Sequence, residues 1–212
     1  MSRPRIGIVG YGMGNIMSLR NAFEAVGTEC FVAETAAALA EASHIVLPGV
    51  GAFPRGMARL RAQGFDEAIH RLTSEDGRPL LGICLGMQLL ASEGEEHEVT
   101  RGLGLIPGRV VRLSTPGLRV PHVGWNETRV LSESRLLDRG PAEPCFYYVH
   151  SYHLQPERAS DATLGCVYGE AFVAGVEREH VMGVQFHPEK SHGAGLALLR
   201  RFAGTGVTAG VR

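Results

Sequence analysis

The feature that most constrains the fold is a regular alternation in the first 92 residues. Short apolar runs that end at or near a small residue alternate with segments whose apolar residues recur every three or four positions. Such apolar runs are typical of buried parallel strands. The three- or four-residue periodicity is typical of the helices that cover those strands. The pattern therefore predicts βαβ units and a parallel sheet with helices on both faces. We expect strands at 5–10, 29–33, 44–49 and 78–84, and helices at 15–26, 36–42, 53–72 (broken near Gly64) and 85–92.

The second half of the chain is dominated by strand-like runs separated by turn residues, at 108–114, 118–131, 145–154, 162–169, 171–177 and 182–188. We expect these runs to extend the same sheet in an antiparallel or mixed manner, and 193–202 to form a closing helix. No linker, repeat or low-complexity segment divides the sequence. The prediction is a single α/β domain over 1–204, with a central mostly parallel sheet flanked by helices, an antiparallel or mixed β extension, and a loose tail at 205–212.

Composition excludes several classes of protein. The chain has 212 residues, 44% of them hydrophobic, and its 21 Lys+Arg against 22 Asp+Glu give a net charge of −1. This balance is typical of a globular domain, and it lacks the basic excess that binds nucleic acid non-specifically. The longest apolar stretch, 80–91, is too short to span a bilayer. Residues 3–10 lack a signal-peptide cleavage site, so we expect a cytoplasmic enzyme or binding protein without a membrane anchor.

The cysteines and histidines do not predict a disulfide framework or a metal site. The four cysteines are scattered, without a C-x-x-C pair. His150 and His153 lie close together, but no third ligand has a convincing spacing. We therefore expect no metal and no cofactor.

A glycine-rich loop at 10–15 follows the first strand and leaves one alternative open. Its glycines are spaced G-x-G-x-G, whereas the dinucleotide fingerprint is G-x-G-x-x-G. Glu34 follows the second strand and is a candidate for binding a ribose. A glycine-rich surface loop is the simpler interpretation.

The strongest local motif is Gly82-Ile83-Cys84-Leu85-Gly86, a cysteine version of the G-x-S-x-G nucleophile elbow. Glycines two residues before and after the cysteine permit a sharp strand-to-helix turn. The turn exposes the sulfur at a helix N-terminus, where the dipole favours the thiolate. The Leu85 N–H is then a candidate oxyanion donor, and Gln88 lies one helical turn further along the same face. The alternative is a buried cysteine in a tight turn.

A histidine and a carboxylate that suit such a nucleophile occur together in Val184 to Glu189, VQFHPE. Pro188 disfavours helix at His187, and in an extended segment residues i and i+2 point the same way. We therefore expect Glu189 to fix the imidazole tautomer while His187 exchanges protons with Cys84. Taken alone, His187 would be interpreted as a surface histidine.

These two motifs, LGICLGMQLL and GVQFHPEKS, resemble those of the class I glutamine amidotransferases. Within that class the chain is most similar to the glutaminase subunits of imidazole glycerol phosphate synthase. The narrower resemblance depends on four further motifs, and together the motifs extend from residue 11 to 192: YGMGNI, LPGVGAF, PHVGWN and YYVHSYH.

The resemblance implies a Cys-His-Glu triad in which Cys84 is the nucleophile, His187 the acid/base and Glu189 its orienter. It also implies that a loop at 48–51 turns a backbone N–H toward the thioester. The oxyanion donors are then Val50 or Gly51, together with Leu85. Because glycines flank Val50, we expect this loop to be able to turn over and thereby to switch the enzyme.

The resemblance further implies ligands and a partner. Gln88 and the backbone at Ser151 and Tyr152 match the positions that hold glutamine, and Asn15, Trp125 and Lys190 match positions near a (β/α)8 cyclase subunit. Ammonia released here would pass through that cyclase, which makes imidazole glycerol phosphate and an aminoimidazole carboxamide ribotide. The chain departs from the family pattern at Arg201, where Asn is expected, and His153 occupies a variable site.

Three alternatives stay open at the level of sequence. A glutaminase that serves anthranilate or pyridoxal phosphate synthesis would share the chemistry and differ in its partner. A peptidase with the same triad would cleave peptides. An inactive binding subunit would not need the intact triad.

Overall fold

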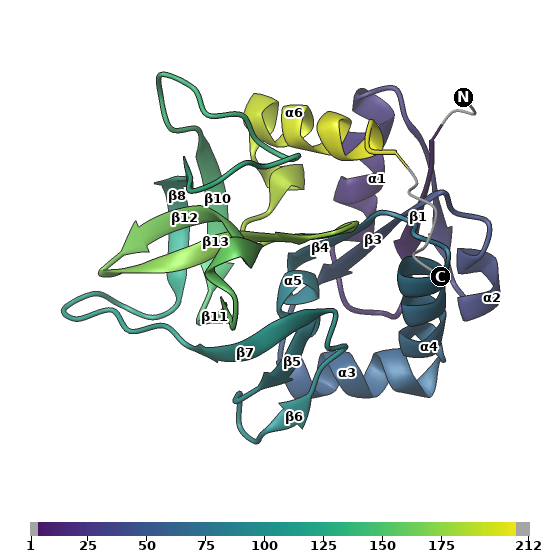
Figure 1. Cartoon of the computed structure of the whole chain (residues 1–212), viewed down its shortest axis with the longest axis horizontal. Coiled ribbons are helices and arrows are strands. Elements are labelled where there is room, and N and C mark those ends of the chain that lie inside the picture. The colour runs from purple at the N-terminus through teal and green to yellow at the C-terminus, as the bar shows by residue number, and fades with distance from the viewer. Residues whose placement is uncertain (1–3, 207–212) are drawn as a thin grey trace.

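The computed structural model describes residues 4–206 and has an eight-stranded sheet at its centre (Figure 1). In spatial order the sheet comprises β2 (Glu29–Ala33), β1 (Arg5–Val9), β3 (His44–Gly49), β4 (Leu80–Cys84), β14 (Val181–Val184), β13 (Glu170–Arg178), β12 (Ala162–Tyr168) and β9 (Arg129–Val130). The first five of these strands are parallel, and the remaining pairings are antiparallel. This arrangement confirms the predicted α/β fold with its antiparallel extension.

Two smaller sheets differ from the prediction that all the later strands would join the main sheet. One pairs β8 (His122–Glu127) with β10 (Cys145–His150), and the other contains β11 (Tyr152–Pro156), β7 (Ile106–Arg112), β5 (Ala91–Gly94) and β6 (Thr100–Arg101). The apolar run at 145–154 divides at Ser151, whose carbonyl accepts a hydrogen bond from the Leu113 N–H at 2.9 Å. Its two halves therefore enter different sheets, which periodicity alone does not reveal.

The helices cover the two faces of the central sheet (Figure 1). α1 (Ile16–Ala25) and α6 (His192–Ala203) lie together on one face, and their apolar residues pack with Ile6 and Ile8 of β1. α2 (Ala36–Leu39), α3 (Phe53–Ala62), α4 (Phe65–His70) and α5 (Leu85–Leu89) cover the other face. Because side chains alternate along a strand, each strand contributes to both layers of the core.

The break expected near Gly64 is confirmed, because Gly64, with a φ of +68°, separates α3 from α4. Three predicted helix ends need correction. The segment expected to end at 72 continues in a π-helical turn to Glu75, and the helix expected at 36–42 ends at Leu39. The helix expected at 85–92 ends at Leu89, because Ala91 and Ser92 belong to β5 and pair with β7. Sheet pairing overrides the helical pattern there. Of the tail expected at 205–212, Thr205 accepts a hydrogen bond from His44 through its carbonyl at 2.8 Å, and residues 207–212 lie outside the described range.

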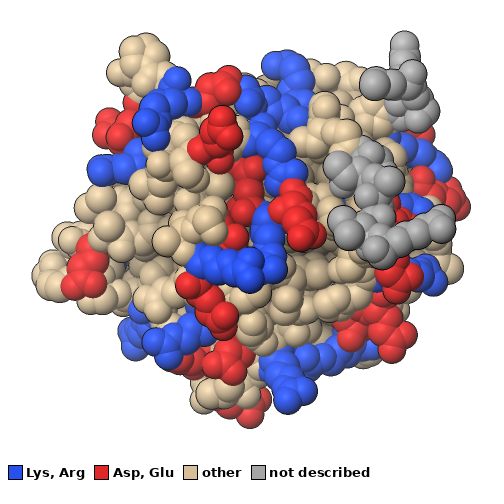
Figure 2. Space-filling view, in the orientation of Figure 1, with Lys and Arg blue, Asp and Glu red and all other residues tan. Residues whose placement is uncertain are grey.

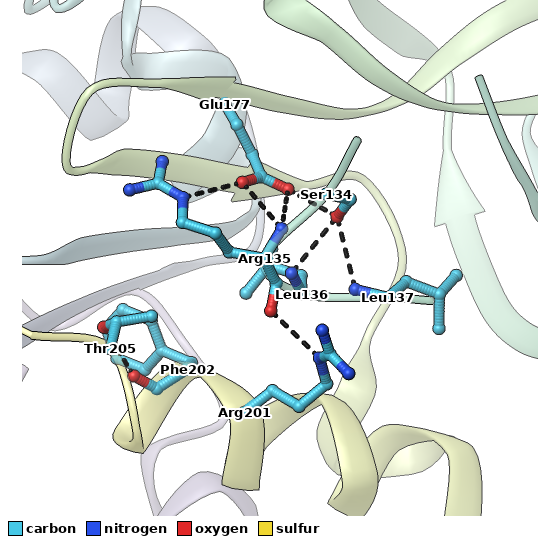
Figure 3. Close-up of polar contacts among 8 residues, drawn as sticks. All are labelled: Ser134, Arg135, Leu136, Leu137, Glu177, Arg201, Phe202 and Thr205. Carbon is cyan, nitrogen blue, oxygen red and sulfur yellow. Dashed lines mark hydrogen bonds and ion pairs between the residues drawn. The ribbon is translucent and has the colours of Figure 1, made fainter. Parts of the chain in front are cut away.

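The loop at 134–137 is held by Glu177 of β13 on one side and by Arg201 of α6 on the other (Figure 3). The Glu177 carboxylate accepts hydrogen bonds from the Ser134 hydroxyl and from the backbone and Nε of Arg135, the last at 3.0 Å. Arg201 of α6 donates from Nε to the Arg135 carbonyl at 3.0 Å. The arginine that departs from the family pattern therefore connects the last helix to this loop.

On the face shown in Figure 2, acidic and basic side chains alternate without a continuous patch of one sign. Within residues 4–206, none of the helices is both long and apolar enough to cross a membrane.

A cluster of buried histidines and aromatic rings joins the β8–β10 pair to the main sheet. His122 stacks between Tyr148 and Tyr168, with ring centroids 4.9 and 4.0 Å away. Burial lowers the pKa of His122 to about 4 and that of His150 to about 3, and it also lowers the pKa of His44. These imidazoles are therefore neutral in the folded protein at neutral pH.

We expect the free energy of unfolding to fall as the pH falls below about 6.5, the pKa of an unfolded histidine. Between the lowered folded value and that pH the unfolded chain binds more protons, so stability decreases with acidification by at most about 1.4 kcal/mol per pH unit for each such histidine. Urea unfolding at about pH 7, 6 and 5 measures this slope.

His44→Gln should reduce the slope, whereas substitution of the exposed His70 by Gln provides the control and should not change it. A wild-type stability that is flat over this range would contradict the prediction.

The approach of α5 to β3 is close enough to exclude any side chain at Gly86. A Cβ built on Gly86 would lie 1.8 Å from the Leu47 carbonyl oxygen, a backbone atom that a rotamer change cannot move away. In α6, by contrast, a Cβ on Gly193 would meet nothing within 4 Å. A side chain is therefore excluded at Gly86 and permitted at Gly193, although both glycines lie in helices.

Gly86→Ala should destabilise the protein by about 3 kcal/mol or more, because α5 must move away from β3. Gly193→Ala is the matched control and should be neutral or stabilising by up to about 1 kcal/mol. Thermal and urea unfolding of both variants test this, and equal effects of the two substitutions would refute the close-approach explanation.

Candidate active site

Three parallel strands bring the predicted site residues to one edge of the sheet. Gly49 of β3 is paired with Cys84 of β4, and Val184 of β14 is paired with Ile83. The oxyanion loop, the elbow and the segment that carries His187 therefore follow directly from the carboxyl ends of adjacent strands. In α/β sheets, ligands bind at this edge.

Cys84 has the strained backbone that a nucleophile elbow requires. Its φ of 55° and ψ of −110° lie where non-glycine residues are rare. A Cβ on Gly82 would lie 2.7 Å from the Gly86 carbonyl oxygen, so this turn closes only with glycine at both positions. The Cys84 side chain is 6% exposed, and the Leu85 N–H at the start of α5 has no acceptor within the helix.

His187 and Glu189 are joined by a hydrogen bond of 2.8 Å between Nδ1 and Oε1. Their side chains are only 2% and 1% exposed. The local geometry corrects the prediction of a continuous extended segment, because Glu189 lies in a 3₁₀ turn at Pro188–Lys190. The turn begins at Pro188 since proline suits its first position, and it folds the carboxylate back onto the ring.

The carboxylate determines the tautomer of His187. A carboxylate only accepts hydrogen bonds, so Nδ1 carries the proton and Nε2 is the nitrogen available for chemistry. Nε2 is buried and makes no hydrogen bond of its own. Burial lowers the pKa of His187, but Cys84 and Glu189 outweigh that effect and raise it above the ordinary value. The arrangement therefore favours the protonated form of the His187 imidazole.

Eight of the predicted residues line one cavity of about 310 Å³: Val50, Gly51, Cys84, Leu85, Gln88, Ser151, Tyr152 and His187. Glu96, Pro121, Val149 and His150 complete the lining and were not predicted from sequence. Glu96 also accepts a hydrogen bond from the Phe53 N–H at 2.7 Å. Glu96 occurs in a run of acidic residues, so nothing in the sequence distinguished it.

The loop at 48–51, which is predicted to supply an oxyanion donor, is buried at its first two residues and exposed at its last two. The Tyr11 hydroxyl donates to the Pro48 carbonyl at 2.9 Å. A Cβ on Gly49 would lie 2.8 Å from the Leu85 Cβ, so the loop packs directly against the elbow. Val50, by contrast, is 44% exposed, and Gly51 has a φ of +109°. The turnover expected for this loop would therefore involve Val50 and Gly51, its exposed part.

Gln88 contacts two groups with its amide nitrogen. It donates to the Tyr152 carbonyl at 2.8 Å and to Gln185 Oε1 at 3.1 Å. Gln185 in turn directs its Nε2 at Cys84 Sγ, 3.7 Å away. Sequence reasoning missed Gln185, because a neutral amide between apolar residues carries no chemical signal of its own.

Of the three residues predicted near a partner, Trp125 and Lys190 lie close together around Tyr147. Trp125 is 48% exposed on β8, within the strand-like run expected at 118–131, and it stacks on His192 with centroids 5.1 Å apart. Lys190 Nζ lies 5.5 Å from the ring centroid of Tyr147, whose edge also meets Trp125. Asn15 precedes α1, which packs against the Pro188–Lys190 turn.

The remaining predictions concern cofactors and thiols. Among residues 4–206, no group of three His, Cys, Asp or Glu side chains is arranged to hold a metal ion. Cys84 is one of four free thiols.

Comparison with known proteins identifies the family. Residues 8–204 match the family model of the class-I glutamine amidotransferases. The chain is 43% identical to imidazole glycerol phosphate synthase subunit HisH 2 of Nitrobacter winogradskyi, over 93% of this chain and 97% of that protein. It is 46% identical to subunit HisH of Syntrophotalea carbinolica, over 92% and 97%.

Solved structures have the same fold. PurLQS from Thermotoga maritima superposes with a TM-score of 0.74 at 20% identity, over 96% of this chain and 99% of that one. A glutamine amidotransferase from the same organism gives a TM-score of 0.67 at 16% identity, over 95% and 97%. With an elbow cysteine and a carboxylate-oriented histidine in one cavity, and relatives over nearly its whole length, the chain belongs to the class I glutamine amidotransferases.

Proposed function

We propose that this chain is the glutaminase subunit of an imidazole glycerol phosphate synthase. It hydrolyses L-glutamine to glutamate and ammonia, and it delivers the ammonia to a (β/α)8 cyclase subunit in histidine biosynthesis. The observation that carries the proposal is Cys84, on its strained elbow, in the same cavity as His187, whose Nδ1 is bonded to Glu189. The subunit HisH relatives, at 43% and 46% identity, support this pathway over anthranilate or pyridoxal phosphate synthesis.

In the first half-reaction the Cys84 thiolate attacks the side-chain amide carbon of glutamine. The carbonyl oxygen becomes an oxyanion, which the Leu85 N–H and an N–H of Val50 or Gly51 stabilise. His187 donates its Nε2 proton to the departing nitrogen, so that ammonia leaves and a thioester remains. Glu189 keeps the imidazole in the tautomer that this step requires.

In the second half-reaction water cleaves the thioester. His187 Nε2, now neutral, removes a proton from the water as its oxygen attacks the carbonyl carbon. The same backbone donors stabilise the second tetrahedral intermediate. Its collapse releases glutamate and returns the sulfur as a thiolate beside the imidazolium.

Gln88 is suited to hold the amino-acid head group. Both hydrogens of its amide are donated, to Tyr152 and to Gln185, so its Oε1 is free to accept from an ammonium group. Ser151 directs its carbonyl to Leu113 of the neighbouring loop. In the trans peptide that follows, the Tyr152 N–H points the opposite way, and we infer that it binds the carboxylate of glutamine.

The surface formed by Asn15, Trp125 and Lys190 is the proposed contact with the cyclase. A closed route from one subunit to the other has a chemical reason, because free ammonia is protonated in neutral water and ceases to be a nucleophile. The proposal is of a cytoplasmic heterodimer that needs no cofactor.

Cys84→Ala should abolish synthesis from glutamine in the complex with the cyclase and leave synthesis from added ammonium salts intact. The variant lacks the nucleophile, whereas ammonium bypasses it. Product formation with each nitrogen source measures this, and the ammonium reaction controls for folding and assembly. Turnover of glutamine by the variant would refute the assignment of Cys84.

Glu189→Gln should retain more glutaminase activity than His187→Ala. Loss of a general acid/base costs about a hundred- to ten-thousandfold, whereas an amide can still hold the imidazole, though in a less favourable tautomer. Ammonia release from glutamine measures both variants, with circular dichroism as the check on folding. Two equally inactive, folded variants would show that Glu189 does more than orient.

A further inference from the structure

The Tyr152 carbonyl is the fixed point of a hydrogen-bond network around the cavity. Its oxygen accepts from Gln88 Nε2 at 2.8 Å and from His150 Nδ1 at 2.9 Å. A carbonyl oxygen cannot donate, so both partners must present an N–H to it. This requirement determines which atom Gln185 turns toward Gln88 and which nitrogen of His150 carries the proton.

The first branch leads to the nucleophile. Since Gln88 presents its NH2 group, the atom of Gln185 that faces it at 3.1 Å must be the carbonyl Oε1. The NH2 group of Gln185 is then directed at Cys84 Sγ, 3.7 Å away. Gln185 is completely buried, so no solvent competes for this donor. A flipped Gln185 would place two NH2 groups against each other.

The second branch leads away from the cavity through two histidines. His150 donates from Nδ1 to Tyr152, so its neutral ring accepts at Nε2 from His122 Nδ1, at 3.1 Å. His122 Nε2 then accepts from Asn126 Nδ2 at 3.3 Å.

Asn126 is oriented independently of the histidines. Its Nδ2 also donates to the Val167 carbonyl, and its Oδ1 accepts from the Glu127 N–H. The Tyr152 carbonyl at one end of this branch and Asn126 at the other therefore require the same tautomers of His150 and His122. Burial lowers the pKa of both histidines, which agrees with neutral rings.

We propose that Gln185 is a further catalytic residue that donates a hydrogen bond to the Cys84 sulfur and holds it as the thiolate nucleophile. We include in the proposal that His150 is a positioning residue, which acts through the Tyr152 carbonyl and Gln88. The proposal deepens the glutaminase function and rests on it for its role in turnover. The hydrogen bond from Gln185 to Cys84 does not involve the substrate, so it can be tested without glutamine.

The physical reason is the difference between a thiol and a thiolate as acceptors. An N–H bond to a neutral sulfur is weak, whereas a bond to an ionised group contributes more. Gln185 therefore favours the ionised sulfur. Because Gln185 cannot rotate without breaking its bond to Gln88, the donor is already in place before the substrate binds.

Alkylation of Cys84 tests the donor in the full chain. The Cys84 peptide is quantified by mass spectrometry after reaction with iodoacetamide across a pH series. Gln185→Met and Gln185→Glu both lack the donor, and Glu keeps the shape and the acceptor for Gln88. We expect both variants to react about tenfold more slowly than wild type near pH 7, with the profile displaced to higher pH. Gln155→Met, on the exposed part of β11, is the control and should match wild type.

Unchanged alkylation in folded Gln185→Met would overturn the proposal, because Met has a similar volume, adds no charge and lacks the donor. In the complex with the cyclase, both variants should lower kcat for glutamine more than they raise KM. If the wild-type complex releases no ammonia from glutamine, the proposed function fails, and alkylation still decides whether Gln185 is the donor.

The histidine branch is tested by ¹⁵N NMR of histidine-labelled protein. We expect His122 and His150 to be neutral with the proton on Nδ1 near pH 7, and His122→Gln and His150→Gln identify their signals. His150→Phe should raise KM for glutamine, and His150→Asn, which keeps an N–H near the place of Nδ1, should restore part of it. A proton on Nε2 of His150, or a charged ring, would overturn this part of the proposal.

Discussion

The close approach of α5 to β3 is the contact on which the cavity depends. Gly86 leaves no space for a side chain beside the Leu47 carbonyl, and Gly49 in turn packs against the Cβ of Leu85. The elbow that carries Cys84 and the loop that carries Val50 are therefore packed against each other through backbone. No flexible side chain separates Gly49 from Leu85, so the start of the loop and the elbow hold each other in place.

Local backbone signals explain why much of the site could be predicted from sequence. Glycines around Cys84 and the proline after His187 each act on their own neighbours, so the turn at one and the extended backbone at the other follow from a few residues. The parallel half of the sheet was predictable for a similar reason, because each strand and its covering helix are contiguous. The contact between Glu189 and His187 was predicted correctly. The backbone conformation was not, because Glu189 lies in a 3₁₀ turn and not in an extended segment.

What sequence could not reveal depends on contacts between distant segments. The break at Ser151 is set by pairing with β7, about forty residues earlier in the chain, and it separates β10 from β11. Gln185 acquires its role only because β14 lies beside β4, which brings it next to Cys84 and Gln88. A single sequence contains no local pattern that distinguishes such an amide from a structural one.

The same cavity contains two histidines with opposite electrostatic environments, and the difference lies in what each Nδ1 contacts. His187 donates to a carboxylate and lies near Cys84, and these two groups raise its pKa despite burial. His150 donates to a neutral carbonyl and has other imidazoles around it, so burial prevails and its pKa falls to about 3. In the mechanism that we propose, proton transfer is confined to His187, while His150 keeps one tautomer. The carboxylate partner of His187 thus suits it to acid/base chemistry, and the neutral carbonyl partner of His150 suits that histidine to a positioning role.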